Sequence, residues 1–161
     1  MKFKKAKLFW IENLKRIESI PYDGDIEYYA FLRKYREKGY KQVVITSEIM
    51  IQIIKEAYLK KQYHVYKMEF VEEDDDLQQE INALLSLIEQ NSGYLIELLD
   101  KLKFLSEKSS IDLKRIYVKG EDAENNPVLF FVQSNGIIGI NSSAFLSISK
   151  ELCGLVERCL F

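Results

Sequence analysis

The sequence predicts an α+β fold with a mixed sheet, and three patterns support this prediction. Residues 25–71 alternate between helical and strand-like spacing of apolar side chains, which predicts a parallel crossover in the N-terminal half. Residues 77–105 carry apolar side chains at helical spacing and predict a long central helix. Residues 113–140 contain strand-like runs and an Asn-Gly pair, so we expect a C-terminal antiparallel meander covered by a last helix.

The N-terminal half is expected to hold two helices between short strands. Residues 6–12 are assigned to a strand, although the apolar side chains of residues 2–20 also suit a helix. A turn is expected at 19–24, which contains a proline and a glycine. The chain then predicts, in order, a helix at 25–38, a strand at 42–46, a helix at 47–61 and a strand at 64–70. The run at 42–46 is β-branched and apolar on both faces, as in a central parallel strand, so a right-handed crossover to 64–70 is expected.

The C-terminal part is expected to consist of three strands and a helix. The strands are expected at 113–120, 128–134 and 137–140. Asn135-Gly136 joins the last two as a tight hairpin with a type I′ turn, because both residue types accept positive φ angles. Ser142 or Ser143 is expected to cap the final helix.

The segment 75–107 organises the rest of the prediction. Its apolar positions alternate by four and three residues, and Asn91 is the only polar interruption. The tripeptide 91–93, Asn-Ser-Gly, is a turn signal and by itself predicts two antiparallel helices. The stripe keeps its register on both sides of the tripeptide, however, and this favours one continuous helix. At ~1.5 Å per residue such a helix is roughly 50 Å long, which exceeds the width of about 35 Å expected for the domain.

A helix longer than its domain offers a surface to a partner, and we expect a homodimer or a protein partner there. A polar Asn at the seam can fix the register and number of paired helices. The alternative is that the stripe, which is wider than a two-position seam, is buried in its own domain. The expected interface positions are Leu77, Ile81, Leu84, Ile88, Asn91, Leu95, Leu98, Leu102 and Leu105.

Composition and charge are those of one globular domain over residues 1–161. The whole chain has a net charge of −2, but residues 1–71 carry +6 and residues 72–161 carry −8. We therefore distinguish a basic α/β half at 1–71 from an acidic β-meander and helix half at 108–161. Attraction between the two halves within one fold accounts for this asymmetry, and an anionic partner of the basic half is the alternative.

The expected location is the cytoplasm, without a membrane partner. No run of apolar residues approaches the ~18 that a membrane helix needs, and the apolar run after the N-terminal lysines is too short for a signal peptide. Cys153 and Cys159 are expected to be buried free thiols, because six residues apart on one helix they point in different directions.

Motifs for catalysis, cofactors and metals are absent, so we assign no catalytic residue, no cofactor and no metal site. The acidic run 72–76 is interpreted as charge at a helix N-terminus rather than as a metal site, and His64 as a packed or edge strand residue rather than a catalytic one. Helix starts with free backbone amides can bind anions. The weak candidates for such binding are Thr46, Ser47, Asn141, Ser142 and Ser143.

These observations favour a non-catalytic interaction module, such as an adaptor, inhibitor or assembly subunit, acting through the long helix. One alternative is a small-anion or nucleotide-sensing domain that uses the helix starts. The other is a nucleic-acid-binding protein that uses the basic half, although a sequence pI near 5.6 is far from the usual basic footprint.

Overall fold

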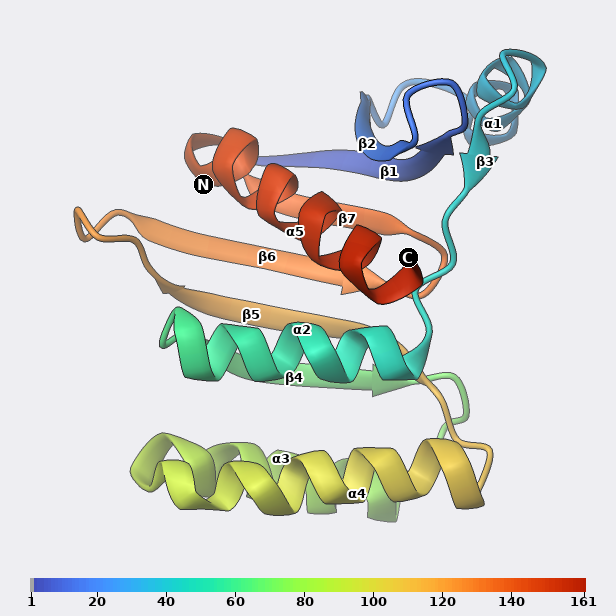
Figure 1. Ribbon diagram of the computed structural model, residues 1–161. Helices are drawn as coiled ribbons and strands as arrows, with labels where there is room; N and C mark the ends of the chain where they lie inside the picture. Colours follow the sequence, from blue (N-terminus) through green and yellow to red (C-terminus); the bar gives the residue numbers. More distant parts are fainter. Residues whose placement is uncertain (1) are drawn as a thin grey trace.

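The computed structural model describes residues 2–161 and combines an antiparallel sheet of seven strands with five α-helices (Figure 1). The strands are β1 (Phe3–Ile11), β2 (Arg16–Tyr22), β3 (Lys41–Gln42), β4 (His64–Phe70), β5 (Leu113–Glu121), β6 (Pro127–Gln133) and β7 (Ile137–Asn141). The helices are α1 (Tyr28–Glu37), α2 (Ser47–Lys60), α3 (Asp75–Gln90), α4 (Leu95–Lys108) and α5 (Phe145–Leu160), with 3₁₀ turns η1 (Ser92–Tyr94) and η2 (Ser142–Ala144).

The predicted α+β class is confirmed, but the prediction of a mixed sheet with a parallel crossover was wrong. The strand order is β2-β1-β7-β6-β5-β4, with β3 beside β1, and every pairing is antiparallel. Only the first residue of the expected strand at 42–46 pairs in the sheet. The next residues cross the end of the sheet, where the Val43 amide donates to Leu8 and the Ile45 amide to Ser134. Val43 and Ile45 are buried in this crossing, which explains an apolar run that resembled a central strand.

The N-terminal strand is longer than expected and opens a hairpin. β1 pairs with β2 along seven residues, from Lys5 opposite Tyr22 to Ile11 opposite Arg16. The turn between them contains neither glycine nor proline, and Lys15 supplies the positive φ of 50°. Turn residues of other types carry little sequence signal, so this hairpin was missed.

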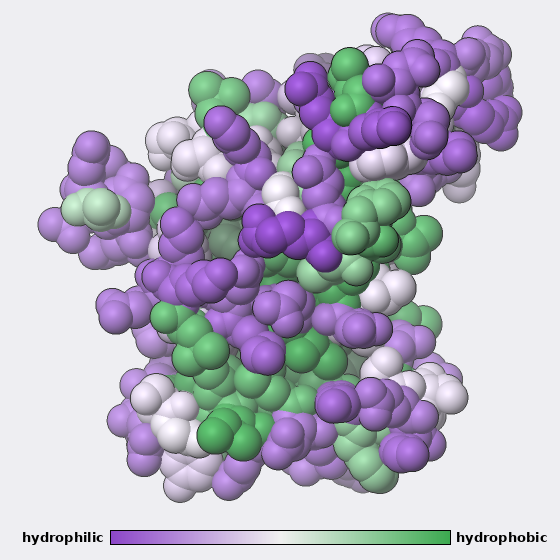
Figure 2. Space-filling model, in the orientation of Figure 1, coloured by the Kyte–Doolittle hydropathy of each residue, from purple (hydrophilic) through white to green (hydrophobic). Residues whose placement is uncertain are grey.

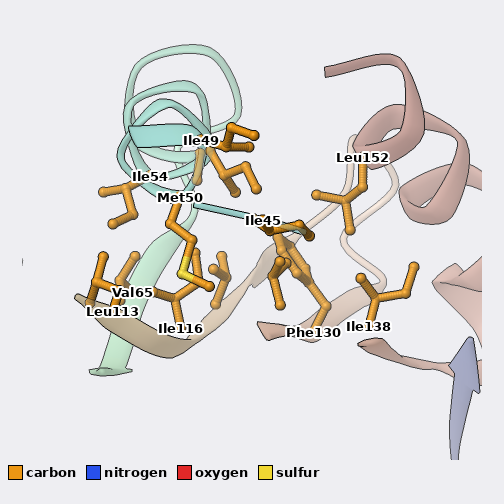
Figure 3. Close-up of a cluster of buried hydrophobic side chains, with 14 of the residues drawn as sticks. Ile45, Ile49, Met50, Ile54, Val65, Leu113, Ile116, Phe130, Ile138 and Leu152 are labelled. Carbon is orange, nitrogen blue, oxygen red and sulfur yellow. The ribbon is translucent and has the colours of Figure 1, made fainter. Parts of the chain in front are cut away.

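Helices α2 and α5 cover the same face of the sheet (Figure 1). Figure 3 shows Met50 and Ile54 of α2 on one side and Leu152 of α5 on the other, all directed toward the strands. Ile45 lies between the two helices, at the point where the crossing segment enters the core. The buried strand residues below them include Val65, Ile116, Phe130 and Ile138.

The prediction of one long central helix was wrong, because α3 and α4 are separate helices. Asn91 has extended backbone angles (φ −150°, ψ 109°), and its Oδ1 accepts a hydrogen bond of 2.9 Å from the Gly93 amide. α3 packs against β4 and α4 against α2, so both helices bury a stripe in the same core. Each helix needs its own apolar stripe, and a shared register across the turn therefore carries no information about continuity.

The hairpin of β6 and β7 is confirmed, although its turn is not type I′. Of the two turn residues only Gly136 has a positive φ, 84°, and its amide donates 2.9 Å to Gln133. This geometry fits a loop of three residues in which glycine takes the left-handed position. A Cβ on Gly136 would lie 2.4 Å from the carbonyl oxygen of Val43, so the crossing segment packs directly on this glycine.

We expect Gly136→Ala to lower the free energy of unfolding by about 2 kcal/mol, because it combines a strained φ with a backbone collision. Urea denaturation measures this change. Gly24→Ala is the matched control, since a Cβ there meets nothing within 4 Å. Equal stability of the two variants would contradict the packing of the crossing segment on the hairpin.

Asn91→Leu is expected to lower the free energy of unfolding by about 1 kcal/mol, because the side chain that holds the Gly93 amide is lost. The molar mass in light scattering should stay that of the parent protein. Gln90→Leu, an exposed neighbour, controls for added apolar surface. A gain in stability or mass for Asn91→Leu would support a continuous helical seam instead.

Candidate functional site

A groove with an apolar floor runs between α2 and α5 above the sheet. Its volume is about 340 Å³. Figure 2 shows a recess with hydrophobic surface at its bottom and hydrophilic groups around it, where the two helices face each other in Figure 1. The apolar residues that line it are Ile53, Ala57, Phe130, Ile148, Leu152 and Leu155.

The local sequence of each helix explains why these side chains meet. Ile53 and Ala57 are four residues apart on α2 and therefore share a face. Leu152 and Leu155 are three residues apart on α5 and share a face in the same way. Phe130 projects from β6 between the two helices and forms part of the floor. The groove therefore combines three elements that are distant in the sequence.

Charged side chains form the rim of the groove and connect its two walls. Lys61 and Glu151 form an ion pair of 2.9 Å from the end of α2 to α5. Arg158 of α5 reaches Glu56 of α2 at 3.4 Å, and Lys60 shares the same carboxylate at 2.8 Å. The hydrogen bond to Glu151 holds the pKa of Lys61 above its ordinary value.

The rim carries an excess of positive charge. Its cations are Lys60, Lys61, Lys150 and Arg158, and its carboxylates are Glu56 and Glu151. The net charge around the apolar floor is therefore +2. An apolar ligand with acidic groups would match both properties of the groove.

A second hollow of about 510 Å³ continues the groove toward the start of α2. Both hollows are lined by Glu56, Leu155 and Arg158. The ion pair between Arg158 and Glu56 therefore lies where the two hollows join. The second hollow adds Ile49 and Leu160 as apolar lining. Together the hollows form an elongated site rather than a single small pocket.

Gly154 lies in the wall of the groove, in the middle of α5. A Cβ at this position would meet only the guanidinium of Arg158, at 3.6 Å. Glycine inside a helix costs about 0.5–1 kcal/mol relative to alanine. Nothing in the fold requires a glycine here. The effect of Gly154 is that no side chain projects from this position of α5 into the groove.

The hydroxyl groups of the expected anion site at Thr46 and Ser47 are engaged within the chain. Ser47 is buried, donates to Asp112 at 2.9 Å and accepts from the Leu113 amide at 2.9 Å. Thr46 caps α2 by accepting from the Ile49 amide. Ser47 therefore holds α2 against β5, whereas Thr46 caps its own helix, and the binding of an anion by these two residues stays a prediction.

The second expected anion site, at Asn141, Ser142 and Ser143, serves the fold in the same way. The buried Asn141 amide bonds to Pro127, Leu129 and Ser143, which ties the end of β7 to β6. The hydroxyl of Ser142 donates to the carbonyl of Lys2. Within the described residues, the hydrogen bonds of these side chains are made to the protein itself and do not converge on a shared anion site.

The expected interface positions lie mainly inside this chain. Leu84 is partly buried and Asn91 is exposed. The other positions are buried in the core, namely Leu77, Ile81, Ile88, Leu95, Leu98, Leu102 and Leu105. Because the helix is interrupted at Asn91 and these side chains are buried in the core, no continuous helix presents them to a second copy, and the homodimer seam stays a prediction.

The remaining polar candidates do not converge. His64 is exposed, and its ring meets the edge of Tyr58 at 5.9 Å between centroids. In the acidic run, Asp74 caps α3 by accepting from the Leu77 amide. Among residues 2–161 no three His, Cys, Asp or Glu side chains gather as a metal site, and no helix there is long and apolar enough to cross a membrane.

The two cysteines differ in environment. Cys153 is buried, and burial raises the pKa of its thiol to about 12, which makes it unreactive. Cys159 is exposed rather than buried as expected, and it lines the second hollow. It lies near the end of α5, where the amphipathic pattern no longer faces the core.

Comparison of the chain with protein families, with curated protein sequences and with solved structures gave no match. The site therefore rests on its own geometry. The groove was not predicted from the sequence. The apolar residues of the two helices that form its walls were all assigned to the buried core. The one local signal was Gly154, a glycine inside an otherwise regular helical pattern.

Gly154→Ala is expected to raise the free energy of unfolding by about 0.5–1 kcal/mol, because it removes the cost of a helical glycine without a collision. Urea denaturation tests this. Gly93→Ala should give no such gain, since its Cβ would stand 3.1 Å from Asn91 Oδ1. A loss of stability in Gly154→Ala would show that the groove wall is closed at this point.

Proposed function

We propose that this protein is a non-catalytic interaction module that binds an acidic amphipathic segment of a partner protein between α2 and α5. The single observation that carries the proposal is Gly154, which keeps one wall of the groove open at a cost to the helix. The partner segment inserts apolar side chains between the helices, and its carboxylates meet the basic rim.

The size of the groove supports a peptide segment as the ligand. Its two hollows measure about 340 and 510 Å³, within the range of roughly 300–1,000 Å³ usual for ligand sites. Their elongated arrangement provides separate places for successive apolar side chains. Amphipathic helices bind such grooves through anchors spaced three or four residues apart.

The rim can exchange its own carboxylates for those of a partner. The cations of both ion pairs across the groove are exposed, with side-chain exposures of 46% for Lys61 and 65% for Arg158. The Glu56 carboxylate is only 18% exposed, and it keeps Lys60 as a partner when Arg158 moves away. Exposed pairs of this kind contribute about 0–1 kcal/mol to stability, so opening them costs little. A partner carboxylate can then bind Lys61, Arg158 or Lys150 without leaving a buried charge unpaired.

The proposed location is the cytoplasm, and the sulfur chemistry of the chain supports it. Both cysteines are free thiols, and Cys159 is exposed. Exposed free thiols persist in reducing compartments. This proposal concerns location alone and does not depend on the identity of the partner.

A displayed library of helical peptides tests the proposed function. We expect selection for Glu or Asp together with large apolar residues at helical spacing. Gly154→Trp fills the groove and should weaken binding of the selected peptides at least about ten-fold. Leu146→Trp is the matched control on α5, because Leu146 is 82% exposed and does not line the groove.

Two further measurements make the result decisive. Arg158→Glu should also weaken binding, and the loss should grow smaller at high salt. A bound peptide should slow the reaction of Cys159 with a thiol reagent, because this side chain lines the second hollow. Selected peptides that are basic, or that bind Gly154→Trp as tightly as the parent protein, would contradict the proposal.

A further inference from the structure

The sheet has a second face, opposite α2 and α5, that carries aromatic and basic side chains. In β4, β5 and β6 the residues Val65, Met68, Ile116, Val118 and Phe130 are buried in the core, so their neighbours point away from it. The register of β4 shifts between Val65 and Lys67, and Tyr66 and Lys67 are both exposed there. We call these neighbours the aromatic-cation face, which consists of Tyr66, Lys67, Arg115, Tyr117, Lys119 and Phe131. All six are half-buried or exposed.

Three aromatic rings form a row across the strands of this face. Tyr117 of β5 is the cross-strand partner of Phe131 of β6, and their ring centroids are 6.0 Å apart. Tyr66 of β4 extends the row, 5.8 Å from Tyr117. The rings are inclined at 52° and 50°, so none stacks flat on its neighbour. Their faces remain suited to a planar ligand.

The position of Phe131 is fixed by a glycine on the next strand. Gly139 of β7 lies opposite Phe131, and a Cβ on Gly139 would stand 2.2 Å from the ring. The ring therefore lies over the backbone of β7. This contact orients one end of the aromatic row without any helix above it.

Cations lie between the rings. The guanidinium of Arg115 is 5.0 Å from the ring centroid of Phe131 and 5.7 Å from that of Tyr117. Lys67 lies 5.2 Å from the Tyr117 ring, and Lys119 lies 5.6 Å from the Tyr66 ring. The spacing places a positive charge beside each aromatic ring.

Negative charge on this face is limited and already engaged. Glu69 accepts a hydrogen bond of 2.6 Å from the Tyr117 hydroxyl, which holds the pKa of Glu69 below its ordinary value. Glu89 of α3 reaches Lys119 only at 3.9 Å. The three cations outnumber the two carboxylates that reach this face, Glu69 and Glu89, so an anionic ligand is favoured.

Arg115 has hydrogen-bonding capacity that the fold does not use. Its Nη1 donates 2.8 Å to the Tyr117 hydroxyl, and its Nη2 donates to Gln133. Within residues 2–161, the Nε of Arg115 is the buried side-chain nitrogen that lacks a partner. An anion that draws the guanidinium outward would supply the missing acceptor.

We propose that the aromatic-cation face binds single-stranded nucleic acid. Bases stack on Tyr66, Tyr117 and Phe131, while phosphates meet Lys67, Arg115 and Lys119. A row of rings on one face of a sheet requires unstacked bases, which single strands offer and duplexes do not. This site lies on the opposite side of the sheet from the α2 and α5 groove and goes beyond the proposed function.

Fluorescence anisotropy with dye-labelled oligo(dT) and oligo(U) tests the proposal. Tyr66→Ala should weaken binding about five-fold or more through the loss of one stacked base. Lys119→Ala should weaken binding and reduce the slope of log affinity against log salt by ~0.7, as expected for one phosphate contact. Both side chains are exposed, so circular dichroism should show an unchanged fold.

Matched controls lie outside this face. Tyr29→Ala removes a tyrosine that is 72% exposed on α1, and Lys150→Ala removes a lysine from the rim of the groove. Neither should change the affinity for the oligonucleotide. Lys103→Ala, which removes an exposed lysine of α4 that the groove does not use, should leave it unchanged as well. Glu69→Gln keeps an acceptor for Tyr117 but removes the negative charge, and it should tighten binding.

Four results would overturn the proposal. The first is an affinity for a duplex equal to that for a single strand of the same length. The second is the absence of binding at low salt. The third is a loss of affinity for the oligonucleotide in Tyr29→Ala but not in Tyr66→Ala. The fourth is a dimer in light scattering that Tyr66→Asp dissociates, which would show that a second copy of the chain covers this face.

Discussion

Burial of one face of the antiparallel sheet beneath α2 and α5 is the constraint on which the other features depend. Both helices must place an apolar stripe on the same face of the sheet, α2 on β4 and β5 and α5 on β2 and β7, although they come from distant parts of the chain. The crossing segment with Val43 and Ile45 brings α2 to that face. Because the helices share the face without filling the space between them, a groove remains above Phe130. The opposite face is left to polar and aromatic side chains.

The edges of the sheet are protected by side chains rather than by further strands. On the free edge of β4, the Tyr58 hydroxyl bonds the amide of Val65 and the Gln78 amide bonds the carbonyl of Met68. On the other edge, Glu157 of α5 accepts from the Ile17 amide of β2 at 2.6 Å. Backbone groups that would otherwise pair with another chain are thereby engaged. A partner strand would find fewer free backbone groups at these edges, so the groove and the opposite face of the sheet are better candidates for partner binding.

Local features of this fold were predictable from the sequence, whereas its topology was not. The helix at 47–61 and the strand at 64–70 were placed within one residue, because each has a cap or a clear period of its own. The hairpin at Asn135-Gly136 was found for the same reason. The pairing of β1 with β7 joins residues more than a hundred positions apart, and no local pattern reports it. At Asn91, equal stripes on two helices imitated one long helix.

The candidate sites were harder to predict for the same physical reason. Residues of the groove come from α2, β6 and α5, and those of the aromatic-cation face from β4, β5 and β6. Their proximity follows from strand order alone. The sequence marked helix starts as binding sites, but the hydroxyl of Ser47 and the amide of Asn141 are engaged within the fold.

We propose that a peptide binds on the side of the sheet that α2 and α5 cover. A spin label on Cys159 tests it most directly, because this thiol is exposed beside the second hollow while Cys153 is buried. We expect strong broadening of the NMR signals of a bound acidic peptide and little broadening of the signals of a bound oligonucleotide. Peptide signals that stay sharp while the peptide remains bound would contradict it.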